Sequence, residues 1–120
     1  EKIPKLNGVI DHIAKPIIKE NIFEPWAENI SELSKIDSLN CKISGMVEEM
    51  NESQEISILK NYTDHVIESF GHDKVMYGSN WPVCLTKKSY SEVLEIAKSI
   101  SNNLEPEEFF YTNGKSFYLD

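Results

Sequence analysis

Three short apolar segments alternate along the chain with longer segments in which apolar residues recur every three or four positions. The short segments cover residues 5–12, 39–44 and 74–78, and each ends in polar residues or glycine. Short apolar runs bounded by turn residues predict buried strands, whereas the longer spacing predicts amphipathic helices. The predicted order is β-α-β-α-β-α with a terminal helix, which is typical of a parallel sheet with right-handed crossovers.

The helix boundaries are predicted from residues that favour the first or last turn. Pro25 suits the first turn of one helix. Asn51 and Gln54 form a plausible capping pair for a long helix over residues 53–70, and a further helix is expected over residues 89–101. The expected apolar faces are Trp26, Ile30 and Leu33; Leu59, Tyr62, Val66 and Phe70; Tyr90, Val93, Ala97 and Ile100; and, in the terminal segment, Phe109, Phe110, Phe117 and Tyr118.

Length and composition limit the classes of function. The 120 residues suit one domain spanning residues 1–120, and 20 acidic against 12 basic residues give a net charge of −8. This acidic balance argues against nucleic acid or an anionic membrane surface as a partner. No apolar run approaches the roughly 20 residues that span a bilayer. Cys41 and Cys84 show no metal-ligand spacing, so we expect reduced thiols in or near the core of a cytoplasmic protein, with a disulfide as the lesser alternative.

Polar residues follow each of the three predicted strands. The carboxyl ends of parallel strands meet at one edge of a sheet. We therefore expect His12, Ser44 and Asn80 to lie together at this edge, around the mouth of one cavity. All 12 basic residues are Lys, so an anionic substrate would be held by Lys, by backbone N–H groups or by another polypeptide. The candidate site residues are His12 and Asn80 for catalysis, with Lys15, Lys42, Ser44 and Trp81 for binding a small-molecule substrate.

Each candidate also has a purely structural interpretation. His12 fits equally well as a core or capping histidine bonded to a backbone carbonyl. Lys15 and Lys42 either hold an anionic group or form ordinary surface ion pairs, and Trp81 fits packing better than substrate stacking. The remaining charged residues predict little chemistry: His65 is expected to be exposed, His72 suits the end of a helix, and Glu48, Glu49 and Glu52 are expected to form a solvated acidic surface.

Four segments together resemble a known family. They are DHIAKP (residues 11–16), CKISGM (41–46), VMYGSNWPVC (75–84) and the end of the chain with Asn113, Phe117 and Tyr118. In this order and spacing they resemble the C-terminal part of the amidohydrolase superfamily. The most similar branch is the lactonase-type amidohydrolases, which include the fuconolactone and dicarboxylate-lactone hydrolases.

The resemblance implies a fold and a reaction. The family forms a (β/α)₈ barrel of about 250 residues, of which this chain would supply the last three βα units and the terminal helix. It implies hydrolysis of a lactone, ester or amide of a small sugar- or carboxylate-type substrate by activated water. In the family, a histidine at the position of His12 ligates a divalent metal or contacts the substrate, and an aspartate at the position of Asn80 acts as general base.

The sequence departs from the family at two points. Asn80 stands in place of the aspartate, and an amide has no basic lone pair with which to take a proton. The opening strand of the family with its His-x-His motif lies outside the sequence, together with about five of the eight strands. A catalytic zinc ion needs three protein ligands, so a zinc-type metal is implied by the family but not supported by His12 and Asn80 alone. Activity of residues 1–120 alone is therefore not expected.

A three-strand segment of a barrel leaves two sheet edges and an inner face uncovered, which favours association. We expect the missing strands to come from upstream sequence, from a partner chain or from self-association. The alternative function is a catalytically silent half-barrel used for binding or assembly. A small doubly wound domain fits less well, because no Gly-rich phosphate loop follows any predicted strand.

Overall fold

The computed structural model describes residues 6–120 and contains a three-stranded parallel sheet. The strands are β1 (Gly8–Ile10), β2 (Leu39–Ile43) and β3 (Val75–Tyr77), in the order β1-β2-β3. All three predicted strands and their parallel direction are confirmed, although each strand is shorter than predicted. Residue 5, the predicted start of the first strand, lies outside the described residues.

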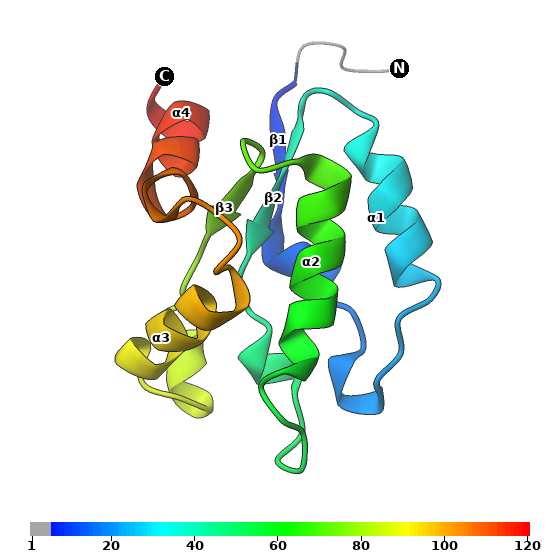
Figure 1. Ribbon diagram of the computed structural model, residues 1–120, viewed down its shortest axis with the longest axis vertical. Coiled ribbons are helices and arrows are strands. Elements are labelled where there is room, and N and C mark those ends of the chain that lie inside the picture. Colours follow the sequence, from blue (N-terminus) through cyan, green and yellow to red (C-terminus); the bar gives the residue numbers. More distant parts are fainter. Residues whose placement is uncertain (1–5) are drawn as a thin grey trace.

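Four helices of seven residues or more accompany the sheet within the described residues. Figure 1 shows α2 in front of the sheet with α1 beside it, while α4 stands next to β3 on the opposite side. The terminal segment enters α4 through a wider helical turn, Glu108–Thr112. The bounds are α1 (Trp26–Ser34), α2 (Ile58–Phe70), α3 (Tyr90–Ile100) and α4 (Asn113–Leu119).

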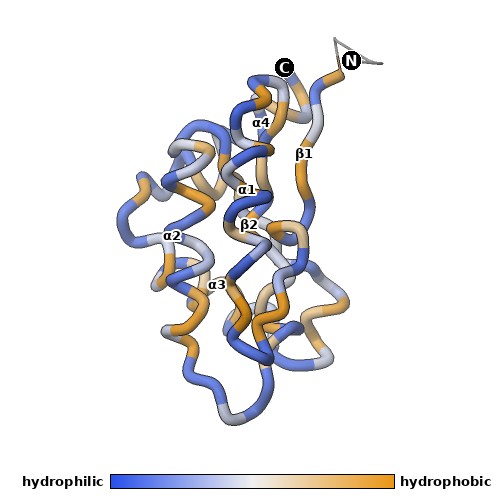
Figure 2. The backbone as a smooth tube through the Cα atoms, turned by 90° about the vertical axis from the view of Figure 1, so that its right-hand side faces the viewer, coloured by the Kyte–Doolittle hydropathy of each residue, from blue (hydrophilic) through white to orange (hydrophobic). Residues whose placement is uncertain are grey.

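The hydrophobic core lies between the sheet and the helices. Cys41, Ile43 and Val75 are core residues of the strands and are essentially inaccessible to solvent. The predicted apolar face of α2 is confirmed, since all four of its residues are buried. Two tyrosines of the predicted faces are exposed instead: Tyr90, in the first turn of α3, is 48% exposed, and Tyr118, near the end of α4, is 56% exposed. Figure 2 shows hydrophobic residues along β1 and hydrophilic residues at the tip of the loop before α2.

The long helix begins five residues later than predicted, at Ile58 rather than residue 53. Asn51 and Gln54 do bond to each other, because the Asn51 N–H donates to Gln54 Oε1 at 3.0 Å. The same two side chains donate to the carbonyls of Lys19 and Ile18, at 2.8 Å and 2.6 Å. These long-range bonds hold residues 51–54 in a separate turn, so the pair does not cap the helix.

The side chains of His65 and Glu48 are less exposed than predicted. His65 is half-buried, and its Nε2 lies 2.8 Å from the Ala27 carbonyl because α1 and α2 pack together there. The carboxylate oxygens of Glu48 are buried and have no hydrogen-bond partner among the described residues. The prediction of exposure was therefore wrong for both groups.

The third helix begins close to its predicted start because of a complete capping box. The Ser89 hydroxyl accepts from the Glu92 N–H, and the Glu92 carboxylate accepts from the Ser89 N–H. Cys41 and Cys84 are buried and not linked by a disulfide, which confirms the prediction of free thiols. Within residues 6–120, no helix combines the length and the hydropathy needed to cross a membrane.

Candidate active site

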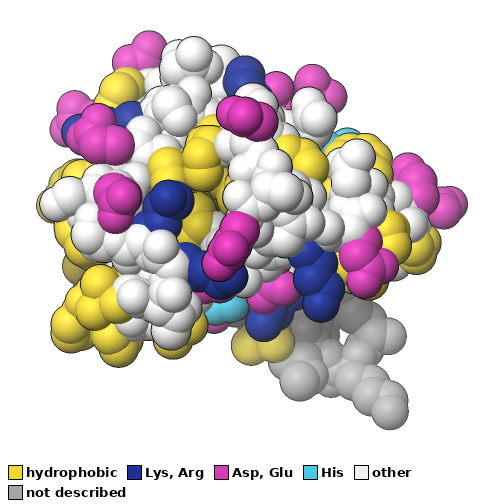
Figure 3. Space-filling model, turned by 90° about the horizontal axis from the view of Figure 1, so that it is seen from below, with side chains coloured by type: hydrophobic (Ala, Val, Ile, Leu, Met, Phe, Trp, Pro, Cys, Tyr) yellow, Lys and Arg dark blue, Asp and Glu magenta, His cyan; other side chains and the backbone are white. Residues whose placement is uncertain are grey.

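A hollow of about 490 Å³ opens at the carboxyl ends of the strands, the side that faces downward in Figure 1. The strand register places Ile10 beside Cys41 and Ile43 beside Tyr77, so the residues that follow each strand lie next to one another. Figure 3, viewed from this side, shows charged and histidine side chains among hydrophobic ones. The hollow is lined by Asp11, His12, Lys42, Ser44, Tyr77, Gly78, Ser79, Asn80, Trp81 and Tyr118.

His12 and Ser44 form the shortest polar contact between predicted site residues. His12 Nδ1 lies 2.7 Å from Ser44 Oγ. The histidine is held by an unusual backbone, because residues 12–15 all have positive φ angles between 47° and 61°. Non-glycine residues rarely adopt this region, and a β-branched residue such as Ile13 does so least. Burial of Ile13 and a 2.6 Å bond from Trp26 Nε1 to its carbonyl hold the conformation.

Two glycines allow these side chains to come together. Gly45 has a φ of +64°, and a Cβ added there would lie 2.8 Å from His12 Cγ and Nδ1. A Cβ added at Gly78 would lie 2.8 Å from Lys42 Cδ and 3.0 Å from Ser44 Cβ. The ends of β2 and β3 therefore need glycine at both positions for the mouth to keep this arrangement.

The charge at the mouth comes from an ion pair between β2 and the end of β1. Lys42 Nζ lies 2.7 Å from Asp11 Oδ1. The hydrogen bond from Lys42 lowers the pKa of Asp11. Burial of the Lys42 ammonium acts to lower its pKa, but bonds to Asp11 and Tyr118 outweigh this effect and the pKa is raised. The same ammonium lies 5.6 Å from the centre of the Tyr118 ring, a cation–π contact.

The structure brings together five of the six predicted site residues. His12, Lys42, Ser44, Asn80 and Trp81 all line the hollow, with Trp81 63% exposed at its rim. Lys15 does not line it and instead pairs with Glu49 at 3.1 Å. Tyr118 lines the hollow but was missed, because the sequence pattern assigned it to an apolar helix face and gave no signal of its contact with Lys42.

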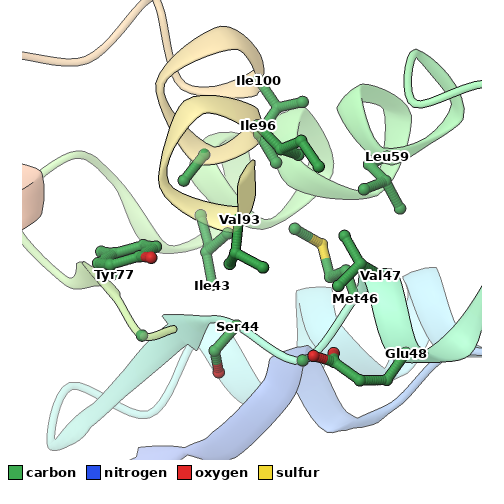
Figure 4. A pocket seen from close by; sticks show the side chains of 13 residues that line it. Ile43, Ser44, Met46, Val47, Glu48, Leu59, Tyr77, Val93, Ile96 and Ile100 are labelled. Atoms are coloured by element: carbon green, nitrogen blue, oxygen red, sulfur yellow. The ribbon is translucent and has the colours of Figure 1, made fainter. Parts of the chain in front are cut away.

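A narrow apolar cavity of about 20 Å³ lies behind the mouth, between the ends of β2 and β3 and helix α3. Figure 4 shows Ile43, Val93 and Met46 lining this cavity, while the Ser44 side chain points away from it. Glu48 and Tyr77 also line the cavity, and the hydroxyl of Tyr77 is buried without a hydrogen-bond partner among the described residues. Ser44 therefore lines both the apolar cavity and the hollow.

The donor set at the mouth does not fit a catalytic zinc ion. Such a site takes three protein ligands from His, Cys, Asp or Glu. Residues 6–120 contain no group of three such side chains placed to share a metal ion. His12 Nδ1 is engaged by Ser44, Asp11 is paired with Lys42, and Asn80 offers only an amide oxygen. The side chains described at this mouth therefore do not form a complete zinc site by themselves.

Comparison with known proteins places the chain in a family. The family model described as amidohydrolase matches residues 1–113. The chain belongs to the amidohydrolase family. An L-fucono-1,5-lactonase of Burkholderia multivorans is 30% identical over 100 residues, which cover 75% of this chain and 34% of the relative. An L-fucono-1,5-lactonase of Burkholderia ambifaria is 35% identical over 82 residues, covering 68% of this chain and 28% of the relative.

The fold of this chain matches a solved structure of an amidohydrolase. A crystal structure of an amidohydrolase from Burkholderia multivorans with bound zinc superposes with a TM-score of 0.82 at 28% identity. The match covers 92% of this chain and 43% of that chain. The predicted resemblance and the parallel α/β fold are thus confirmed. The chain spans about a third of the length of the curated relatives that it matches.

Proposed function

We propose that this amidohydrolase segment forms part of a hydrolase for a lactone or ester of a small sugar- or carboxylate-type substrate. The observation that carries the proposal is the convergence of His12, Lys42, Ser44 and Asn80 on one hollow at the carboxyl ends of parallel strands. Lys42 and Asp11 supply opposite charges for polar substrate groups, and Trp81 supplies an apolar rim. The two lactonase relatives support a lactone as the substrate class.

The complete barrel is part of the proposal. Within the described residues, β1 and β3 each pair with one neighbour, so both are edges of the sheet. Barrel closure would pair both edges and cover the inner face. We propose that the other strands come from the remainder of a longer polypeptide, with a partner chain or a second copy as the other sources. The free, buried Cys41 and Cys84 support a cytoplasmic location.

The test is an assay of the full-length gene product with L-fucono-1,5-lactone, with residues 1–120 assayed in parallel. We expect the full-length protein to hydrolyse the lactone and residues 1–120 alone to be inactive. The variant His12→Ala should lose at least about 10²-fold in kcat/KM, the size typical of a lost acid–base group. Lys115→Ala, at an exposed position on α4, is the matched surface control.

A silent binding module is the second candidate, and Asn80 is the observation that favours it. An amide in place of the aspartate removes the base that would activate water. Lactone binding without turnover, measured by calorimetry on the full-length protein, would support this candidate. Turnover that depends on His12 would reject it.

A further inference from the structure

We propose that Ser44 is the nucleophile of this site, that His12 takes its proton, and that Asn80 stabilises the oxygen anion that forms. The inference rests on the proposed function, because it names the route by which the same site opens a lactone or ester. The attacking group in the first step would be a hydroxyl of the chain itself rather than a water molecule. Asn80 would then contribute to the reaction as a hydrogen-bond donor, although it cannot act as a base.

The contact between Ser44 and His12 has the geometry of a nucleophile and its base. The 2.7 Å between Ser44 Oγ and His12 Nδ1 falls within the reach of about 2.6–3.2 Å expected for such a pair. A neutral imidazole with its hydrogen on Nε2 offers the Nδ1 lone pair to the serine proton. Ser44 is only 4% exposed, yet it lines the hollow and points away from the apolar cavity (Figure 4).

The backbone around His12 supports a functional arrangement. Residues 12–15 all lie in the left-handed region, and such strain persists only where the surrounding structure over-determines it, which is common at active sites. Here Ile13, Trp26 and Gly45 fix the loop and leave the imidazole against Ser44. The pair is therefore preorganised before any substrate arrives.

Asn80 has the chemistry that a serine route requires. Attack on a carbonyl places negative charge on its oxygen, and an amide N–H stabilises that charge as an oxyanion-hole donor. An ionised aspartate offers only acceptors and would repel the same charge. The aspartate suits activation of water, whereas the asparagine suits attack by serine. Asn80 lines the same hollow as Ser44, and its φ of 56° is a conformation that asparagine tolerates.

The two half-reactions balance without any additional reactant except water. Ser44 Oγ bonds to the lactone carbonyl carbon while its proton passes to His12 Nδ1. The ring C–O bond then breaks, and the departing alkoxide takes the proton from His12, leaving an ester on Ser44. Water attacks this ester and gives a proton to His12. Ser44 Oγ leaves with that proton, and the hydroxy acid is released.

The direct test is covalent labelling of the full-length gene product with a fluorophosphonate, followed by peptide mapping. Attack by a serine displaces fluoride and leaves a phosphonyl adduct on its oxygen. We expect one adduct, on the peptide containing Ser44, and its loss in both Ser44→Ala and His12→Ala. The variant Ser79→Ala removes the other serine that lines the hollow and should keep the adduct. An unlabelled Ser44 in the wild-type protein would overturn the proposal, whether or not the variants fold.

Kinetics of Asn80→Asp separate attack by serine from attack by activated water, because the two routes predict opposite changes in kcat. Removal of one oxyanion donor should lower kcat for lactone hydrolysis by about 10²- to 10³-fold. A gain in kcat would show that aspartate restores a water-activating base, and this would overturn the inference. That gain would leave the proposed hydrolase function intact, whereas no lactone turnover by the wild-type protein would count against the proposed function itself.

Discussion

The variant Gly45→Ala tests whether the mouth depends on the close approach of His12 to the end of β2. Alanine at a φ of +64° costs about 1–2 kcal/mol, and its Cβ would lie 2.8 Å from the imidazole. Displacement of the ring would also break its bond to Ser44, which contributes about 1 kcal/mol. The free energy of unfolding should therefore fall by about 2–3 kcal/mol. With a urea slope of about 2 kcal/mol/M, the unfolding midpoint should fall by about 1–1.5 M.

Gly114→Ala is the matched control, because the same substitution meets different surroundings. Gly114 lies inside α4, and an added Cβ would meet no atom within 4 Å apart from the helix's own backbone. Alanine there should raise the free energy of unfolding by about 0.5–1 kcal/mol. Opposite shifts in urea denaturation are thus expected for the two variants. A Gly45→Ala protein that unfolds at the wild-type urea concentration would refute the reasoning about the mouth.

Three further predictions concern the packing around the sheet. Ser89→Ala removes the capping box of α3 and should lower the free energy of unfolding by about 1 kcal/mol, measured in urea. The bond to Glu108 raises the pKa of His72 above 6.5, so this pair stabilises the protein at pH values below 6.5. The stabilisation should be lost as the pH rises through the raised pKa, and unfolding curves of Glu108→Gln should lack this pH dependence. Leu59→Ala leaves a cavity at a fully buried position and should lower the free energy of unfolding by about 2–5 kcal/mol. Leu119→Ala, at a position 78% exposed, should leave the unfolding midpoint nearly unchanged.

The strands and their shared mouth could be predicted because both follow from local pattern. Short apolar runs ending in polar residues determined β1, β2 and β3 to within a few residues, and the parallel order then placed His12, Ser44 and Asn80 at one edge. These inferences require only the spacing of apolar residues along the chain and the rule that the carboxyl ends of parallel strands lie at the same edge of the sheet.

Features that depend on long-range contacts could not be predicted. The Asn51–Gln54 pair fits a helix cap and an isolated turn equally well, and bonds to the carbonyls of residues 18 and 19 decide between them. The sequence pattern gives no signal of the left-handed conformation of Ile13, which is visible only once its burial and the bond from Trp26 are known. The partner of Lys15 was unpredictable for the same reason, since Glu49 follows a different strand.

The indole N–H of Trp26 links the first helix to the loop that carries His12, through the Ile13 carbonyl. Local backbone preference opposes the conformation of residues 12–15, so the orientation of the imidazole depends on the packing of the helix against this loop. The alignment of His12 is consequently a property of tertiary assembly and not of the loop itself. Replacement of Trp26, which does not line the hollow, would therefore release this loop and displace the imidazole.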